Sequence, residues 1–139
     1  MKPFVAALSL VLLLAACTDR YKQVEELQTE VLDLHDTTML KMDALYTTLD
    51  RLKPLRDSLS SDSMSPSAQL DEVVEAMTML RKADDAMMDW MAEFKPVEKD
   101  DPIEESIAYL EEQKKSIIEV DRQMDESMEN GERVLAKLK

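Results

Sequence analysis

Residues 70–94 of the chain have the sequence LDEVVEAMTMLRKADDAMMDWMAEF. Apolar residues recur in this segment at alternating steps of three and four positions, the spacing that places them along one face of an α-helix. Only Asp84 interrupts the apolar character of that stripe. Further apolar residues, such as Met88 and Trp90, widen the stripe on both sides, as expected of a helix with two neighbours. The segment therefore predicts a long helix packed between two others.

The same periodicity extends through the chain on both sides of this segment. Apolar residues recur in threes and fours from Val24 to Leu52 and again from Ile103 to Leu138. Proline and serine, which interrupt or end helices, are concentrated between these stretches. The pattern predicts three helices, at about residues 21–58, 66–95 and 102–138. Helices of similar length joined by short loops form antiparallel bundles, so we expect an all-α, up-down-up three-helix bundle.

Three local signals refine this prediction. Pro54 lacks a backbone N–H, so the first helix should kink or end there. Asp101 precedes Pro102 and has the spacing of an N-cap for the third helix. Gly131 is the only glycine of the chain, and a glycine inside a helix costs about 1 kcal/mol relative to alanine. Either the third helix breaks at Gly131 or a neighbouring backbone passes close to it, and the apolar stripe resumes in phase beyond it, which favours the close approach.

The amino-terminal segment has the features of a secretory leader. Residues 1–16 contain one basic residue and then an unbroken run of apolar or small residues that is too short to span a bilayer. The run leads into Leu14-Ala15-Ala16-Cys17, which resembles the lipobox of bacterial lipoproteins. In that family the cysteine receives a diacylglycerol and becomes the first residue of the mature chain. We therefore expect residues 1–16 to be a signal peptide and Cys17 to be lipidated; the alternative is a plain secretory leader beside which this cysteine falls by chance.

The lipid would also determine the compartment. Cys17 is the only cysteine, so the chain can form no internal disulfide. Several acyl chains hold a protein stably at a bilayer, whereas one holds it reversibly. In enterobacterial lipoproteins an aspartate after the cysteine marks retention in the inner membrane, and the residue here is Thr18. We expect a membrane-anchored protein of the bacterial cell envelope, with the outer membrane favoured over the inner.

Residues 17–139 are enough for a single domain with a modest core. This part of the chain has 30 acidic and 16 basic residues, a net charge near −14. Such a charge repels nucleic acid and anionic lipid headgroups, so we expect no nucleic-acid partner. Acidic helical faces could dock a basic envelope protein, and long amphipathic helices could pair between chains. An envelope protein partner and a homo-oligomer are therefore both open.

The sequence offers little for catalysis. His35 is the only histidine, and the only cysteine is assigned to the lipid, so a Cys-His pair is excluded and a Ser-His-Asp triad would need His35. A single glycine cannot build a phosphate-binding loop. The abundant carboxylates are typical of a solvated helical surface. We therefore expect a protein that is not an enzyme and that has no catalytic residues.

Methionine is unusually frequent, with 11 residues in the chain including the initiator. An antiparallel return of the second helix along the first would place His35 opposite Met91, Met39 opposite Met87 or Met88, and Met42 opposite Asp84. Positions 35, 39 and 42 also share one side of a continuous helix. Thioethers and an imidazole prefer Cu(I) and Ag(I), so these residues could form a copper site whose members would be His35, Met39, Met42, Met88 and Met91. The alternative is that methionine fills gaps in a narrow core or forms an adaptable surface for a partner.

Two charged residues occupy apolar stripes. Asp84 interrupts the stripe of the second helix, and Lys114 interrupts that of the third. A short loop between these helices would place the two side chains at the same level. We therefore predict an Asp84–Lys114 ion pair that fixes the register of the helices. The functional alternative for Asp84 is a ligand or a proton carrier.

The segment Ala83–Met91, with His35-Asp36, Met39 and Met42 upstream, resembles a group of small lipoproteins of Bacteroidota-type bacteria. Some members of that group have the label "viral A-type inclusion protein", which reflects generic helical similarity. The resemblance covers most of the mature chain, and its most specific part is Met-Met-Asp-Trp-Met at residues 87–91. It implies an envelope compartment and a His/Met/Trp pattern shared by the group, and it implies no particular activity.

Two functions follow from these observations. The first is a lipid-anchored envelope lipoprotein whose helical bundle acts as a structural or adaptor module. The second is a periplasmic protein that binds Cu(I) or Ag(I) through the His/Met cluster. They differ in the placement of the ligands: packed methionines and an imidazole pointing to water favour the first, and sulfurs converging with an imidazole nitrogen favour the second.

Overall fold

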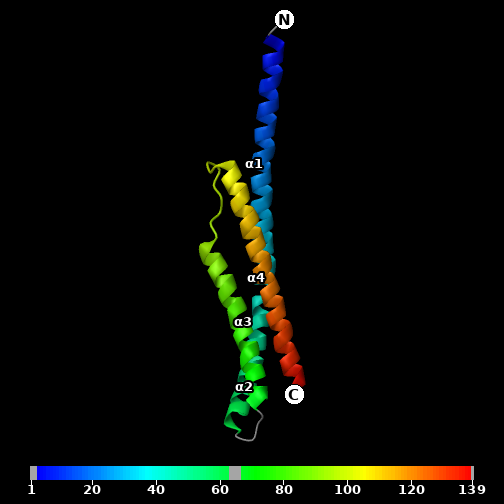
Figure 1. Cartoon of the computed structure of the whole chain (residues 1–139), viewed down its shortest axis with the longest axis vertical. Coiled ribbons are helices and arrows are strands. Elements are labelled where there is room, and N and C mark those ends of the chain that lie inside the picture. The colour runs from blue at the N-terminus through cyan, green and yellow to red at the C-terminus, as the bar shows by residue number, and fades with distance from the viewer. Residues whose placement is uncertain (1–2, 63–66, 139) are drawn as a thin grey trace.

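The computed structural model describes residues 3–62 and 67–138, with side chains from residue 19 onward. Within these residues the chain has no strand and forms the helices α1 (Pro3–Met39), α2 (Met42–Ser61), α3 (Ser67–Glu93) and α4 (Ile103–Lys137). Helices α1 and α2 follow one another and form the first leg of the bundle, α3 returns along it, and α4 runs in the direction of the first leg (Figure 1). The expected all-α, up-down-up three-helix bundle is confirmed.

The first leg bends at Leu40 and Lys41, between α1 and α2. The first helix does not end at Pro54, because α2 continues through Pro54 to Ser61. Two consecutive threonines precede the bend. The hydroxyls of Thr37 and Thr38 donate to the carbonyls one turn earlier, each at 2.8 Å, and such bonds are known to bend helices. The Lys41 N–H then bonds the Thr38 carbonyl at 3.0 Å, which tightens the last turn of α1.

Helix α4 stabilises this bend from the side. The Lys41 ammonium lies 2.7 Å from a carboxylate oxygen of Asp121 and 2.7 Å from one of Asp125. Asp121 also accepts a hydrogen bond of 2.9 Å from the Thr38 hydroxyl. Partial burial lowers the pKa of Lys41, but the hydrogen bonds and charges of the two aspartates outweigh it, so the pKa ends above its ordinary value. The bend is therefore held by charged groups of α4 rather than by glycine or proline.

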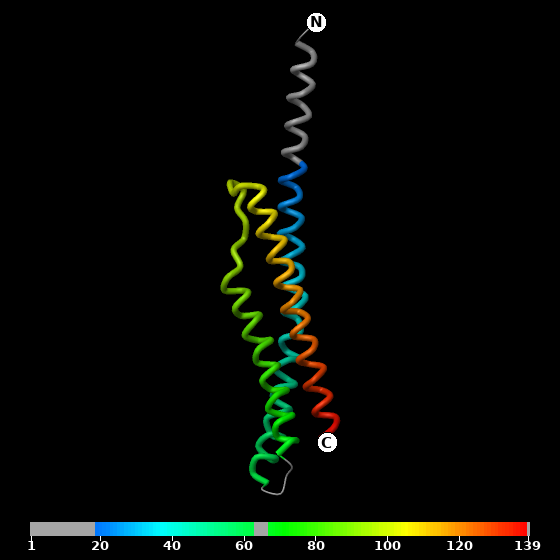
Figure 2. The backbone as a smooth tube through the Cα atoms, viewed as in Figure 1, coloured from blue at the N-terminus to red at the C-terminus, as the bar shows by residue number. Residues whose placement is uncertain are grey.

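The first leg and α4 are parallel and keep one register along their length. Polar pairs between them recur with a separation of 83 or 84 residues: Arg20 with Glu104, Glu30 with Lys114, Thr38 with Asp121, Lys41 with Asp125, and Thr48 with Glu132. The separation is the same on both sides of the bend. Helix α4 is therefore one unbroken helix that packs along both α1 and α2 (Figure 2).

The core is formed by apolar side chains from all three legs. Fully buried members include Leu45 of α2, Leu80 of α3 and Ile117 of α4. Four methionines are buried among them: Met42, Met77, Met87 and Met124. An unbranched thioether fits irregular spaces between helices, which agrees with methionine as a filler of a narrow core.

Helix α4 does not start level with the end of α3, as it would after a short loop, but begins well beyond that end. Residues 94–102 leave α3 as largely extended chain and climb beside α1 before α4 begins (Figure 1). An extended residue advances about 3.3 Å and a helical residue 1.5 Å, so this segment raises the start of α4 by several helical turns. In the resulting register Lys137 pairs with Glu72, and Asn130 donates to the Met79 sulfur.

The start of α4 differs from the prediction by one residue. Asp101 does not cap the helix: its carboxylate accepts the Glu98 N–H at 2.8 Å and so closes the turn in front of it. Pro102 takes the N-cap position with extended backbone angles, and its carbonyl accepts the N–H and the hydroxyl of Ser106, each at 2.9 Å. Proline fits this position because its missing N–H would have no helical partner.

Gly131 lies inside α4, which continues without a break to Lys137. The predicted close approach is real, but side chains make it rather than a backbone. A Cβ at position 131 would lie 2.6 Å from Cγ2 of Thr48 and 3.3 Å from Cδ1 of Leu80. Glycine is therefore needed where the first leg, α3 and α4 meet.

Candidate functional site

The predicted lipid-attachment residue, Cys17, lies outside the residues whose side chains are described, as does the leader. Among the described residues, no helix is long and apolar enough to cross a membrane. Among the described side chains, which start at Asp19, Arg20 already contacts another helix, because its guanidinium pairs with Glu104 at the start of α4. A cross-helix contact thus lies only three residues after Cys17.

A row of stacked rings connects α1, α3 and α4 near this end of the bundle. His35 stacks on Trp90 with ring centroids 5.3 Å apart, and Trp90 stacks on Phe94 at 4.8 Å. Phe94 in turn faces Tyr109 at 6.3 Å, and the Tyr109 hydroxyl accepts the Lys95 N–H at 2.8 Å. The rings fill the space left where α3 ends and the extended segment begins. Trp90, 6% exposed, is the centre of this row.

His35 is held in one orientation by its neighbours. Its Nδ1 lies 3.0 Å from a carboxylate oxygen of Asp36. Its Nε2 is buried and, like Nε1 of Trp90, has no hydrogen-bond partner in the described part of the chain. In the tautomer in which Nδ1–H donates to Asp36, Nε2 carries the lone pair with which a neutral histidine binds metals. The Nε2 atom of His35 therefore does not point to water.

The structure places the four methionines of the predicted copper set in different surroundings. Met42 is 7% exposed in the core and Met39 is half-buried, whereas Met88 and Met91 are 53% and 41% exposed on α3. The expectation that positions 35, 39 and 42 share one side of a continuous helix is wrong, because the bend at residues 40–41 separates Met42 from α1.

The predicted register between the first leg and α3, meaning which residues lie opposite each other, is accurate near His35 but not near Met42. His35 contacts Trp90, one residue from the predicted Met91. Met42 was expected opposite Asp84, but that place belongs to Tyr46, one turn further along α2.

The predicted Asp84–Lys114 ion pair is wrong. Asp84 accepts a hydrogen bond of 2.8 Å from the Tyr46 hydroxyl, and Lys114 pairs with Glu30 of α1 at 2.6 Å. The climb of residues 94–102 moves Lys114 several turns away from the level of Asp84. The hydrogen bond to Asp84, together with burial and the negative charge, raises the pKa of Tyr46 above its ordinary value.

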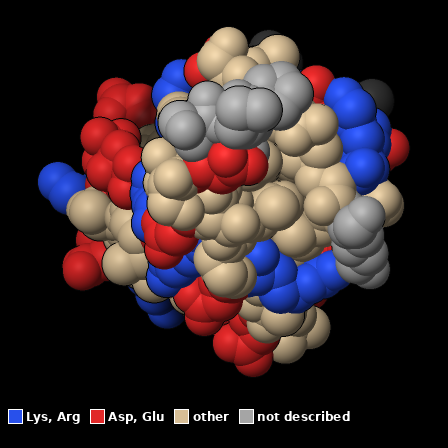
Figure 3. Space-filling model, turned by 90° about the horizontal axis from the view of Figure 1, so that it is seen from below, with Lys and Arg blue, Asp and Glu red and all other residues tan. Residues whose placement is uncertain are grey.

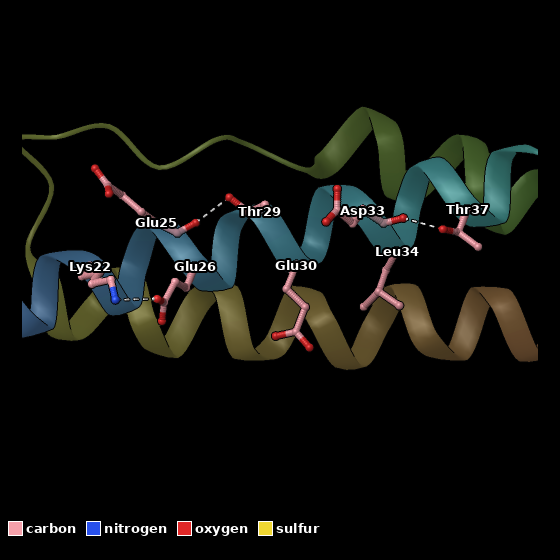
Figure 4. A pocket seen from close by; sticks show the side chains of 8 residues that line it. All are labelled: Lys22, Glu25, Glu26, Thr29, Glu30, Asp33, Leu34 and Thr37. Carbon is pink, nitrogen blue, oxygen red and sulfur yellow. Dashed lines mark hydrogen bonds and ion pairs between the residues drawn. The ribbon is translucent and has the colours of Figure 1, made fainter.

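Two hollows of the described surface are open and have several acidic side chains in their lining. One, of about 600 Å³, lies along α1 alone (Figure 4), where Glu25, Glu30 and Asp33 are among its lining residues. Another, of about 450 Å³, lies between α3 and α4 beside Trp90. In neither does a His, Ser or Cys form a hydrogen-bonded catalytic set among the described residues. Nor do the described side chains contain a group of three or more His, Cys, Asp or Glu residues arranged to hold a metal.

Two features of this region were not predicted. The ring row includes Phe94, which directly follows α3, and Tyr109 of α4, and the only available signal was that they are two of the few aromatic residues in the chain. The polar cluster of Thr38, Lys41 and Asp121 was also missed. The sequence signal for this cluster was Thr38 in an otherwise apolar stripe, next to Thr37, because such threonines can bend a helix.

Comparison of the chain with protein-family models, with curated proteins and with solved structures gave no match.

Proposed function

We propose that this protein is a lipid-anchored lipoprotein of the bacterial cell envelope whose helical bundle acts as a structural or adaptor module without chemistry of its own. The observation behind the proposal is that the lipobox residue Cys17 lies only three residues before Arg20, which pairs with Glu104 of α4. An anchor at this position would leave almost no linker between the lipid and the folded domain. The bundle would then be held directly at the membrane surface.

The shape of the bundle supports a module that extends from a membrane. From Arg20 to Ser61 the first leg has about 40 residues, which at 1.5 Å per helical residue gives a rod of about 60 Å. The end opposite the N-terminus mixes basic and acidic side chains around uncharged surface (Figure 3). Residues near the anchor are more acidic, with Glu98, Asp100, Asp101 and Glu104 close in sequence. Their charge would repel anionic headgroups, so the long axis would stand away from the bilayer. We favour the outer membrane because the residue after Cys17 is Thr18 and not an aspartate.

Replacing the anchor residue tests this proposal. In Cys17→Ser, we expect incorporation of a tagged fatty acid to disappear and the chain to move from the membrane fraction to the soluble envelope fraction or to stay uncleaved. Thr18→Ser changes the neighbouring residue with a hydroxyl kept in place and should leave both labelling and fractionation unchanged. A Cys17→Ser chain that is still labelled and cleaved before residue 17 would rule out lipidation at this cysteine.

A periplasmic Cu(I)- or Ag(I)-binding protein is the second candidate, and one observation favours it. Asp36 holds Nδ1 of His35, and the buried Nε2 has no partner among the described residues. A carboxylate behind a histidine is the usual support of a metal-binding imidazole. Met39, one turn after His35, and Met91, next to Trp90, are the thioethers closest in sequence to the stacked pair. Met42, in the core, is separated from them by the bend.

Anaerobic titration with Cu(I) against a competing chelator tests this candidate. Binding at His35 should quench the fluorescence of Trp90, the only tryptophan, with one-to-one stoichiometry. The double variant His35→Ala, Met91→Leu should abolish the effect, whereas Met79→Leu on the other side of α3 should leave it intact. Absence of quenching in the unaltered chain would exclude the copper site.

A further inference from the structure

Several large apolar side chains of the first leg and of α3 remain exposed. Four of them lie near the places where these legs touch: Leu32 on α1, Tyr46 on α2, and Met88 and Met91 on α3, exposed by 39%, 43%, 53% and 41%. We call these four residues the apolar face. A monomeric protein exposes single apolar residues commonly, but a group of them on one side marks an interaction site.

Two contacts between the legs indicate where these four residues lie. His35 reaches from α1 to Trp90 of α3, and Leu32 precedes His35 by three positions. Residues three or four positions apart are neighbours on a helix, so Leu32 lies beside the junction of α1 and α3.

The contact between α2 and α3 shows where Tyr46, Met88 and Met91 lie. Tyr46 of α2 bonds Asp84 of α3, and Met88 follows Asp84 by four positions. Met91 follows Met88 by three and adjoins Trp90. The apolar face therefore follows the junction of the first leg with α3, over about 14 residues from Leu32 to Tyr46, or about 20 Å.

Acidic residues border this face on each helix. Asp36 lies one turn after Leu32 and Asp43 one turn before Tyr46, while Asp84 and Asp85 lie one turn before Met88. The Asp36 side chain is 79% exposed. A second copy presenting the same face would bring two sets of carboxylates together, and an anionic membrane would be repelled in the same way. The border therefore favours a partner with positive charge.

We propose that the apolar face is the docking surface for a basic amphipathic helix of a partner protein, an inference that rests on the adaptor function proposed above. A helix of about 14 residues covers the 20 Å of the face, with its apolar side on Met88 and Met91. Lysine and arginine on its flanks pair with the bordering aspartates. Exposed methionines suit this role because their flexible, polarisable side chains adapt to the shape of the partner.

The test uses the lipidated full-length product in zwitterionic lipid nanodiscs, with methyl-labelled methionine observed by NMR. The probe is a helical peptide of about 16 residues with leucine on one side and lysine on the other, and the matched peptide has glutamate in place of lysine. We expect the lysine peptide to shift the methyl signals of Met88 and Met91 and to leave those of the buried Met77 and Met124 in place. The glutamate peptide should bind at least about tenfold more weakly.

Substitutions on exposed positions complete the test without disturbing the core. Met88→Lys together with Met91→Lys should weaken binding of the lysine peptide by about tenfold or more. Ile118→Lys is the matched control, since Ile118 is 47% exposed on α4, outside the apolar face. It should leave the affinity within about twofold.

Each other outcome overturns the inference in a distinct way. Unchanged affinity in the Met88→Lys, Met91→Lys variant would show that the peptide binds another surface, which contradicts the docking surface but not an adaptor function. Line broadening of Met88 and Met91 by paramagnetic lipid, without peptide, would identify the membrane as the occupant. Self-association lost in the same double variant would identify a second copy. Failure of the chain to bind the lysine peptide would reject the docking surface, whereas anchoring is decided separately by Cys17→Ser.

Discussion

Trp90→Ala is expected to destabilise the bundle by about 3–5 kcal/mol, because it removes a large side chain that is 6% exposed and leaves a cavity. The loss would also remove the stacks with His35 and Phe94, which connect α1 with α3 at the level where the backbone of α3 gives way to extended chain. Urea denaturation followed by far-ultraviolet circular dichroism measures the effect, since the fluorescence of the only tryptophan disappears with the substitution.

Two further variants separate the causes of this loss. Trp90→Phe should cost only about 1–2 kcal/mol, because Nε1 has no acceptor among the described residues and its removal leaves no group unpaired. Tyr21→Ala, at an aromatic residue that is 46% exposed, should change stability by less than about 0.5 kcal/mol. A loss below about 1 kcal/mol in Trp90→Ala would show that the ring row does not hold the legs together.

The second prediction concerns Gly131, where two effects oppose each other. Alanine favours the helix by about 1 kcal/mol. Its Cβ would, however, lie 2.6 Å from Cγ2 of Thr48, whose hydroxyl is bonded to the Ala44 carbonyl at 2.9 Å. Forcing an extra carbon into a packed site costs about 1–3 kcal/mol. We therefore expect Gly131→Ala to lower the free energy of unfolding by up to about 2 kcal/mol net, measured by urea denaturation.

A double-mutant cycle with Thr48→Ser isolates the clash. Serine keeps the hydroxyl and removes Cγ2, so the new Cβ then meets no atom closer than Leu80 Cδ1 at 3.3 Å. In this background Gly131→Ala should become neutral or stabilising by up to about 1 kcal/mol, a coupling of about 2 kcal/mol between the two positions. Equal destabilisation in both backgrounds would contradict the packing explanation.

The helices themselves could be predicted because their signal is local. The stripe of residues 70–94 has one apolar face, and α3 (Ser67–Glu93) buries Val73, Met77, Leu80 and Met87 from it. Gly131 was recognised for the same reason, since a glycine inside a continuing stripe requires an explanation. These features depend on the spacing of residues along one helix and not on the path between helices.

Features that depend on the path of the chain could not be predicted. The expected Asp84–Lys114 pair assumed a short loop, and the rise of an extended segment such as 94–102 has no periodic signal in the sequence. The bend at residues 40–41 depends on Asp121 and Asp125, which lie some 80 residues later and meet Lys41 only in the folded bundle. The same bend separated Met42 from His35 and divided the expected copper set.

The constant separation of 83 or 84 residues between the first leg and α4 has a consequence for the order of folding. In each of these pairs, the partner on α4 is made only after most of the 139-residue chain. Contacts so distant in sequence form late, because a long loop must close before they contribute. Helices α2 and α3, which are consecutive in sequence, can pair early, whereas the part of α1 around Arg20 stays without its partner on α4 until synthesis is nearly complete. An envelope lipoprotein, as proposed above, has to cross a membrane, and this order of folding suits a chain that crosses before it folds, because the part that crosses first is the last to pack into the bundle.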